Sequence, residues 1–185
     1  MGREKLTLTV GGVPLIRRVH DALVPFCREI LVVGDGPDVL PGVPRLRDLR
    51  GGREGPLAGL EAGLGAASSP AVFVAAGDMP FLSRGLVGYS LEMMRTRGLK
   101  AVVPRLAGRV HPLCAAYDRG VLRDVSRLLD AGTRAARALL EELGDGVGYV
   151  EGELTRFGDP EVFLTNVNSP EDLARARGMA GGGEG

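Results

Sequence analysis

The sequence predicts an α/β fold with a mostly parallel sheet that is covered by helices on both faces. Short runs of continuously apolar residues, typical of strands buried on both faces, alternate with segments whose apolar residues recur at helical spacing. The length of 185 residues, with 44% hydrophobic and 25% charged residues, fits one globular domain. We place this domain at residues 1–177 and expect the glycine-rich segment 178–185 to be a disordered tail.

Five apolar runs are predicted as strands. They share a length of four to six residues and an abundance of valine, alanine and leucine. These runs are 29–34, 71–76, 101–104, 113–117 and 161–164.

Helical segments are predicted between the strands, at 14–25, from 56 onward, at 83–97, 118–129 and 134–143, and from 169 onward. Pro14 and Pro56 stand at helix starts, where the missing N–H of proline costs nothing. Ser83 and Ser169 are predicted as N-caps. The run Ser169-Pro170-Glu171-Asp172 adds a first-turn proline and an acid three residues after the cap, which is a strong helix start.

Composition argues against several classes of protein. The formal net charge is zero and the basic residues are spread along the chain, so nucleic-acid binding is not expected. No apolar run approaches the ~20 residues that span a bilayer, and residues 1–5 lack a signal-peptide stretch, so a membrane role is not expected and the cytoplasm is the default location. Cys27 and Cys114 lie far apart in sequence, which favours two buried thiols over a zinc site.

Asp78 is the first candidate for chemistry. It follows the predicted strand 71–76 in the run Gly77-Asp78-Met79-Pro80-Phe81-Leu82. Ligands of open α/β sheets gather beyond the carboxyl ends of strands, and a carboxylate at that place can hold Mg²⁺. The competing interpretation is an aspartate that only ends the strand and turns the chain before Pro80.

A glycine-rich stretch, Gly51-Gly52-Arg53-Glu54-Gly55-Pro56-Leu57-Ala58-Gly59-Leu60, leads into the second predicted helix. A helix N-terminus offers backbone N–H groups and the positive end of the helix dipole. Small residues at 55, 58 and 59 let a flat ring or a phosphate approach the backbone closely. A plain loop followed by a tightly packed helix explains the same residues.

Two further polar segments are candidates for ligand contacts. The amides of Asn166 and Asn168 can bind phosphate oxygens or support a metal-binding carboxylate, or they can simply organise the turn before the last helix. Arg109 and His111 lie between two predicted strands and can contact an anionic substrate. A structural role for His111 stays equally open, and His20 is interpreted as structural.

The order of these motifs resembles the MobA family of molybdenum-cofactor guanylyltransferases. The resemblance covers nearly the whole chain apart from the glycine-rich tail, and the elements GPLAG and DMPF are its most specific pieces. Related cytidylyl- and uridylyltransferases usually differ at the GPLAG position. The segments that carry the resemblance are 1–5, 10–16, 55–59, 78–81 and 166–171.

The resemblance implies a three-layer, Rossmann-like nucleotide-binding fold of the nucleotidyltransferase type. It also implies transfer of GMP from GTP to the terminal phosphate of molybdopterin, with release of pyrophosphate. By this resemblance Lys5 would neutralise GTP phosphates, Asp78 would bind Mg²⁺, and Asp48 would help to hold the guanine nucleotide.

The remaining site residues implied by the resemblance fall into two groups. Those expected along the nucleotide are Gly55, Pro56, Leu57 and Gly59. Those expected to face molybdopterin or the metal are Arg109, His111, Asn166 and Asn168.

One departure from the family concerns the start of the sequence. Family members begin earlier, with a strand and a loop resembling L-A-G-G-x-S-x-R-M-G-x-D-K, whereas this sequence starts at the Met-Gly of that loop and has Glu4 where aspartate is common. That first strand is central in the family's sheet, so neighbouring strands are expected to lack a ladder partner, and an unpaired buried group costs roughly 1–3 kcal/mol. Either the start codon is assigned too late, which we favour, or the protein is degenerate. In both cases we expect this chain to bind GTP poorly.

Three functional hypotheses follow. The leading one is a Mg²⁺-dependent guanylyltransferase that acts on molybdopterin. The second is a transferase that uses another nucleotide, such as CTP. The third is a non-catalytic family member that binds other cofactor-biosynthesis proteins or molybdoenzymes.

Overall fold

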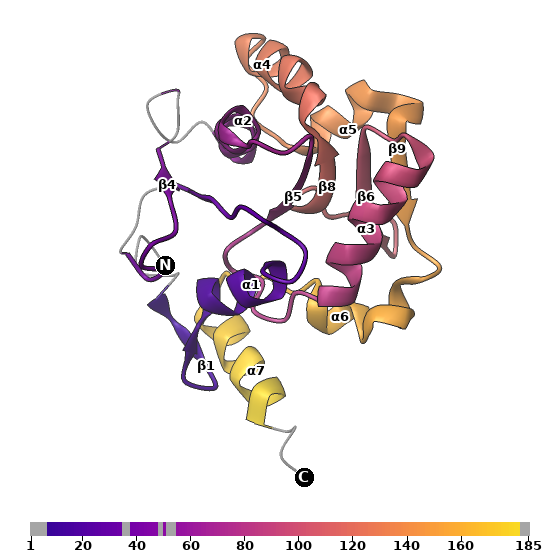
Figure 1. Ribbon diagram of the computed structural model, residues 1–185. Coiled ribbons are helices and arrows are strands. Elements are labelled where there is room, and N and C mark those ends of the chain that lie inside the picture. Colours follow the sequence, from indigo (N-terminus) through magenta and orange to yellow (C-terminus); the bar gives the residue numbers. More distant parts are fainter. Residues whose placement is uncertain (1–6, 35–37, 48–49, 51–54, 182–185) are drawn as a thin grey trace.

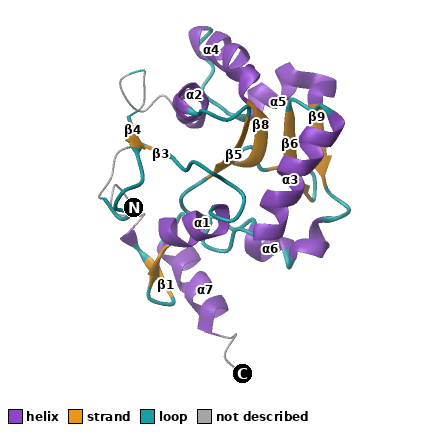
Figure 2. Cartoon of the chain, in the orientation of Figure 1, coloured by secondary structure: helices purple, strands orange, loops and turns teal. Residues whose placement is uncertain are grey.

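The computed structural model describes residues 7–34, 38–47, 50 and 55–181. Its helices are α1 (Leu15–Leu23), α2 (Pro56–Ala66), α3 (Arg84–Arg97), α4 (Leu122–Asp130), α5 (Arg137–Leu143), α6 (Pro160–Phe163) and α7 (Pro170–Gly181). Its strands are β1 (Thr9–Val10), β2 (Val13–Pro14), β3 (Val32–Val33), β4 (Arg45–Leu46), β5 (Ala71–Ala75), β6 (Ala101–Leu106), β7 (Arg109–Val110), β8 (Cys114–Asp118) and β9 (Val147–Val150). Strands and helices alternate, so the predicted α/β class is confirmed (Figure 2).

The main sheet has the order β5-β8-β6-β7, with β9 paired to β6. Only β6 and β9 run parallel in it, while β5/β8, β8/β6 and β6/β7 are antiparallel. The expectation of a mostly parallel sheet is therefore wrong, and the sheet is mixed. A tight turn is one cause, because Ala107 (φ 48°) and Gly108 (φ 77°) both adopt the positive φ that a two-residue hairpin requires. Such a short connection reverses the chain, whereas a parallel pair needs a long crossover.

Helices cover both faces of the main sheet (Figure 1), and each face holds an apolar layer. On one face α3 packs on side chains such as Val102 and Ala116. On the other face α2, α4 and α5 pack on Val103 and Tyr117. Neighbouring residues of one strand enter opposite layers because side chains alternate along a strand. This alternation produces the expected helix–sheet–helix arrangement.

A short parallel sheet, β3–β4, lies apart from the main sheet. Among the described residues β3 pairs only with β4, and β5 pairs only with β8. Residues 29–31, 33 and 69–77 line an apolar groove of about 970 Å³, which α2 also lines. No described strand joins β3 to β5.

The prediction of a strand over residues 161–164 is wrong, because this segment lies largely in the short helix α6. Asp159 accepts a hydrogen bond from the N–H of Glu161 at 3.0 Å and Pro160 occupies the first turn, so a cap and a proline start a helix there. The apolar run that suggested a strand is explained by burial of Phe163 and Leu164 in the core. The strand predicted over 29–34 is reduced to β3.

The two predicted serine caps differ in outcome. Ser169 caps α7, since its Oγ accepts from the N–H of Asp172 at 3.1 Å while the Asp172 carboxylate accepts from the N–H of Ser169 at 2.9 Å. Ser83 precedes α3 without capping it, because its hydroxyl donates to the carbonyl of Phe157 at 2.8 Å. The Ser83 hydroxyl is therefore bound to a residue distant in the sequence and forms no capping hydrogen bond with the first turn of α3.

Helix α7 extends through Gly181, four residues into the segment for which disorder was expected. Leu173 and Ala176 pack with Val10, and Arg177 donates to the carbonyl of Thr9 at 3.1 Å. Contacts with the β1–β2 hairpin thus extend the helix beyond the point at which glycine composition predicts its end. No helix of the described residues is long and apolar enough to cross a lipid bilayer.

Candidate active site

Asp78 and Asn166 meet at the end of β5. Asp78 follows the strand by three residues, and the Asn166 Nδ2 donates to its Oδ1 at 2.7 Å. The backbone closes the same contact, because the N–H of Val167 donates to the carbonyl of Asp78 at 2.9 Å. The structure therefore brings together two motifs that are 88 residues apart in the sequence. An amide that orients a carboxylate is one of the arrangements expected for this asparagine.

A pocket of about 720 Å³ opens beside this pair. Its walls come from five parts of the chain: the start of α2, the turn after β5, the segment from β7 to β8, the connection from α4 into α5, and the segment between α6 and α7. Five of the predicted site residues line it: Pro56, Arg109, His111, Asn166 and Asn168. Asp78 adjoins the pocket through its neighbour Met79 and through Asn166. Gly59 instead lines the apolar groove beside β5, which Pro56 also reaches.

The start of α2 is shaped by a close approach to Arg134. Gly55 has φ 78°, and a Cβ atom at this position would lie 3.0 Å from the carbonyl oxygen of Arg134. The N–H of Leu57 donates to the same oxygen at 3.2 Å, and the Leu57 side chain is fully buried. The glycine of the GPLAG element is thus required by the backbone of the α4–α5 connection, and Leu57 acts in packing.

Two further arginines, Arg134 of the α4–α5 connection and Arg137 at the start of α5, join Arg109 and His111 in lining the pocket. No aspartate or glutamate of the described residues lines it. Arg134 and Arg137 were not predicted as site residues from the sequence. A usable signal exists, because arginines at the start of a predicted helix oppose the dipole preference for acids there. Four basic side chains around one pocket make it suited to an anionic ligand.

His111 is the titratable group of this pocket whose environment is most informative. Burial, followed by the charge of Arg109, lowers its pKa below the ordinary value of 6.5. The imidazole is therefore neutral at pH 7 in the free protein. Its backbone is also structural, since its N–H donates to Pro104 at 3.1 Å and its carbonyl accepts from Cys114 at 3.0 Å. Both roles considered for this histidine are compatible with its position.

The donor set at Asp78 offers oxygen ligands, which suit a hard cation. The described residues contain no group of three or more histidine, cysteine, aspartate or glutamate side chains that could hold a metal ion. A single carboxylate with an adjacent amide does not make a protein-only cage, but it matches Mg²⁺, which combines one or two carboxylates with substrate phosphates. Two predicted nucleotide contacts, Lys5 and Asp48, lie outside the described residues.

Comparison with known proteins identifies the family. The model of the MobA-like NTP transferase domain matches residues 1–147. The chain belongs to this family. It is therefore a nucleotidyltransferase, as the order of its motifs predicted.

Relatives of this MobA-like protein are similar over almost its whole length. A probable molybdenum cofactor guanylyltransferase of Pelotomaculum thermopropionicum is 35% identical, over 97% of this chain and 87% of the relative. The molybdenum cofactor guanylyltransferase of Cereibacter sphaeroides is 33% identical, over 96% of this chain and 89% of the relative.

Solved structures confirm the nucleotidyltransferase fold. The molybdopterin-guanine dinucleotide biosynthesis protein A of Archaeoglobus fulgidus superimposes with a TM-score of 0.81 at 27% identity, covering 98% of this chain and 92% of that one. The 2-C-methyl-D-erythritol 4-phosphate cytidylyltransferase of Thermus thermophilus gives a TM-score of 0.72 at 28% identity, covering 95% of this chain and 93% of that one.

Proposed function

We propose that this MobA-like protein transfers GMP from GTP to molybdopterin, which forms molybdopterin guanine dinucleotide and releases pyrophosphate. The observation that carries the proposal is the Asp78–Asn166 pair beside a pocket lined by basic side chains. Such a site suits the joining of two phosphate-bearing molecules, because each brings negative charge that must be offset. The names of the relatives at 33% and 35% identity support the choice of both substrates.

In the proposed reaction an oxygen of the molybdopterin phosphate attacks the α-phosphorus of GTP. The new P–O bond forms as the bond to pyrophosphate breaks, so little covalent chemistry is asked of the protein. Its contribution is to hold the two anions in line, which can supply much of the rate enhancement. Arg109, Arg134 and Arg137 lower the repulsion between them.

Asp78 is proposed to hold Mg²⁺ together with phosphate oxygens of the nucleotide. Mg²⁺ bound there supplies positive charge that stabilises the charge developing on pyrophosphate. Asn166 keeps the carboxylate oriented by donating to Oδ1. His111, neutral in the free protein, is proposed to donate a hydrogen bond to the acceptor phosphate, and an anion beside it would raise its pKa again. Lys5 and Asp48 are proposed to contact the nucleotide.

The test measures dinucleotide and pyrophosphate formed from molybdopterin with GTP or CTP, at matched concentrations and with Mg²⁺. Product is expected from GTP at saturating nucleotide concentration, where weak binding does not limit turnover, and Asp78→Asn is expected to lower kcat/KM by roughly 10²-fold or more. Asp145→Asn is the control, because this aspartate does not line the pocket. Product from CTP alone would favour the cytidylyltransferase alternative, which the structural likeness to the Thermus thermophilus enzyme supports. Absence of product with both nucleotides would contradict the proposal and favour a non-catalytic binding protein.

A further inference from the structure

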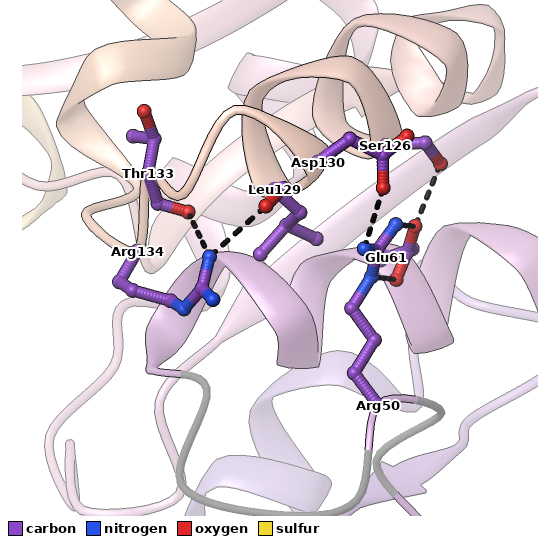
Figure 3. Close-up of polar contacts among 7 residues, drawn as sticks. All are labelled: Arg50, Glu61, Ser126, Leu129, Asp130, Thr133 and Arg134. Carbon is purple, nitrogen blue, oxygen red and sulfur yellow. Dashed lines mark hydrogen bonds and ion pairs between the residues drawn. The ribbon is translucent and has the colours of Figure 1, made fainter.

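Arg50 joins α2, whose first residue lines the pocket, to α4, which precedes the pocket-lining residues 134–137 (Figure 3). Its Nε and one terminal nitrogen donate to the two carboxylate oxygens of Glu61 on α2, at 2.7 and 2.8 Å. Its other terminal nitrogen donates to Asp130 at the end of α4, at 2.7 Å. Ser126 of α4 also donates to Glu61, at 2.7 Å. One guanidinium thus binds carboxylates of both helices at the same time.

Glu61 depends on this arrangement because its side chain is only 8% exposed. A buried carboxylate is costly unless it is paired and hydrogen-bonded. The hydrogen bonds from Arg50, followed by the one from Ser126, lower the pKa of Glu61 and keep it ionised. The planar fork of arginine can satisfy two carboxylates in fixed directions, which the point charge of lysine cannot reproduce.

The end of α4 leads directly into the pocket wall. Arg134 donates from one terminal nitrogen to the carbonyls of Leu129 and Thr133, at 3.0 and 3.2 Å (Figure 3). Its own carbonyl accepts from the N–H of Leu57 at the start of α2. The end of α4 and the connection that follows are therefore tied to α2 at two places, through Arg50 and Asp130 and through Arg134 and Leu57.

We propose that Arg50 is a positioning residue of the transfer reaction. By binding Glu61 and Asp130 together, it sets the end of α4 against α2 and so places the Arg134 connection at the pocket. Arg50 itself does not line the pocket, so it acts through Arg134 and not by contact with substrate. This inference rests on the proposed function, since the anion that Arg134 would meet is molybdopterin phosphate.

Asp130→Asn is the most discriminating variant. Asp130 is 69% exposed, so its replacement removes the ion pair between Arg50 and α4 without leaving a buried charge unpaired. The unfolding midpoint is expected to change by less than about 2 °C, as for an ordinary surface pair. The KM for molybdopterin is expected to rise roughly tenfold with kcat within about threefold, because a small displacement of a binding group is costly. A merely structural defect would instead lower kcat through loss of folded enzyme.

Arg50→Lys tests the contact with Glu61. Lysine keeps the positive charge but cannot donate two parallel hydrogen bonds to the Glu61 carboxylate. This substitution is expected to raise the same KM, by an amount equal to or larger than that of Asp130→Asn. Arg127→Met is the matched control. Arg127 also lies on α4 and also binds two carboxylates, those of Asp124 on α4 and Glu142 on α5, and neither of these ion pairs joins α4 to α2. The kinetic constants of the Arg127→Met protein are expected to equal those of the wild type.

Amide hydrogen exchange at Leu57 provides a readout that does not depend on catalysis. Exchange is expected to be about tenfold faster in Asp130→Asn and unchanged in Arg127→Met, because the hydrogen bond to Arg134 is weakened only in the former. Wild-type KM values together with unchanged exchange in Asp130→Asn and Arg50→Lys would overturn the proposal. If wild-type protein forms no dinucleotide, the proposed function fails, and exchange at Leu57 alone then decides whether Arg50 places the connection.

Discussion

Gly55→Ala is the substitution whose effect can be worked out most fully from the structure. Gly55 has φ 78° and ψ −175°, a region that is essentially restricted to glycine and costs other residues on the order of 1–3 kcal/mol. The added Cβ would lie 3.0 Å from the Arg134 carbonyl oxygen and 3.2 Å from its Cβ. The α4–α5 connection must then move and weaken the hydrogen bond from Leu57, which is worth about 1 kcal/mol. Together these effects predict a loss of roughly 2–4 kcal/mol in the free energy of unfolding.

The assay is urea unfolding followed by circular dichroism at 25 °C, with Gly65→Ala as the matched control. Gly65 lies in α2, the helix that Gly55 precedes, and a Cβ there would meet no atom within 4 Å. Because alanine is a better helix former than glycine, the control is expected to gain about 0.5 kcal/mol. The two substitutions therefore have opposite signs. A Gly55→Ala protein within about 0.5 kcal/mol of the wild type, with an unchanged m-value, would refute the steric reasoning.

Two further predictions concern titratable groups. The folded-state pKa of Glu61 lies below its ordinary value of 4.5, so its carboxylate stabilises the fold above that pH and loses this effect as pH falls through the folded-state pKa. The stability advantage of the wild type over Glu61→Gln in urea unfolding should therefore be constant near pH 7 and shrink below about pH 4.5; an advantage that does not change with pH would contradict this. Burial raises the pKa of Cys114 to about 12, and Cys27 is only half-buried. Iodoacetamide at pH 8 should modify Cys27 first and Cys114 only after unfolding, as mass spectrometry with a Cys27→Ser control would show; rapid labelling of native Cys114 would contradict the burial argument.

Prediction from the sequence succeeded where local signals agreed. Continuous apolar runs located β5, β6 and β8, and the combination of serine, proline and acid located the start of α7. It failed at 161–164, where buried apolar residues belong to a short helix that Asp159 and Pro160 begin. A four-residue segment with three apolar residues is too short for its periodicity to distinguish a strand from a helix, and here the cap decides.

The parallel or antiparallel direction of strand pairing also could not be predicted from local sequence patterns. A buried strand looks the same in sequence whether its neighbours are parallel or antiparallel, so the mixed sheet had to come from the turn at Ala107 and Gly108 and from the packing of both faces. The length of α7 is a similar case, because its last turns depend on the β1–β2 hairpin.

The sequence by itself determined the family, the order of the motifs, and the presence of an aspartate after β5 and a glycine before α2. Only the tertiary structure decided that Asn166 reaches Asp78, that Arg134 accounts for the glycine at 55, and that Arg50 joins Glu61 to Asp130. The physical reason is that each of these contacts links segments far apart in the chain. An arginine that positions a pocket and one that lies in solvent have the same local sequence signal, and folding alone brings their partners within hydrogen-bond distance.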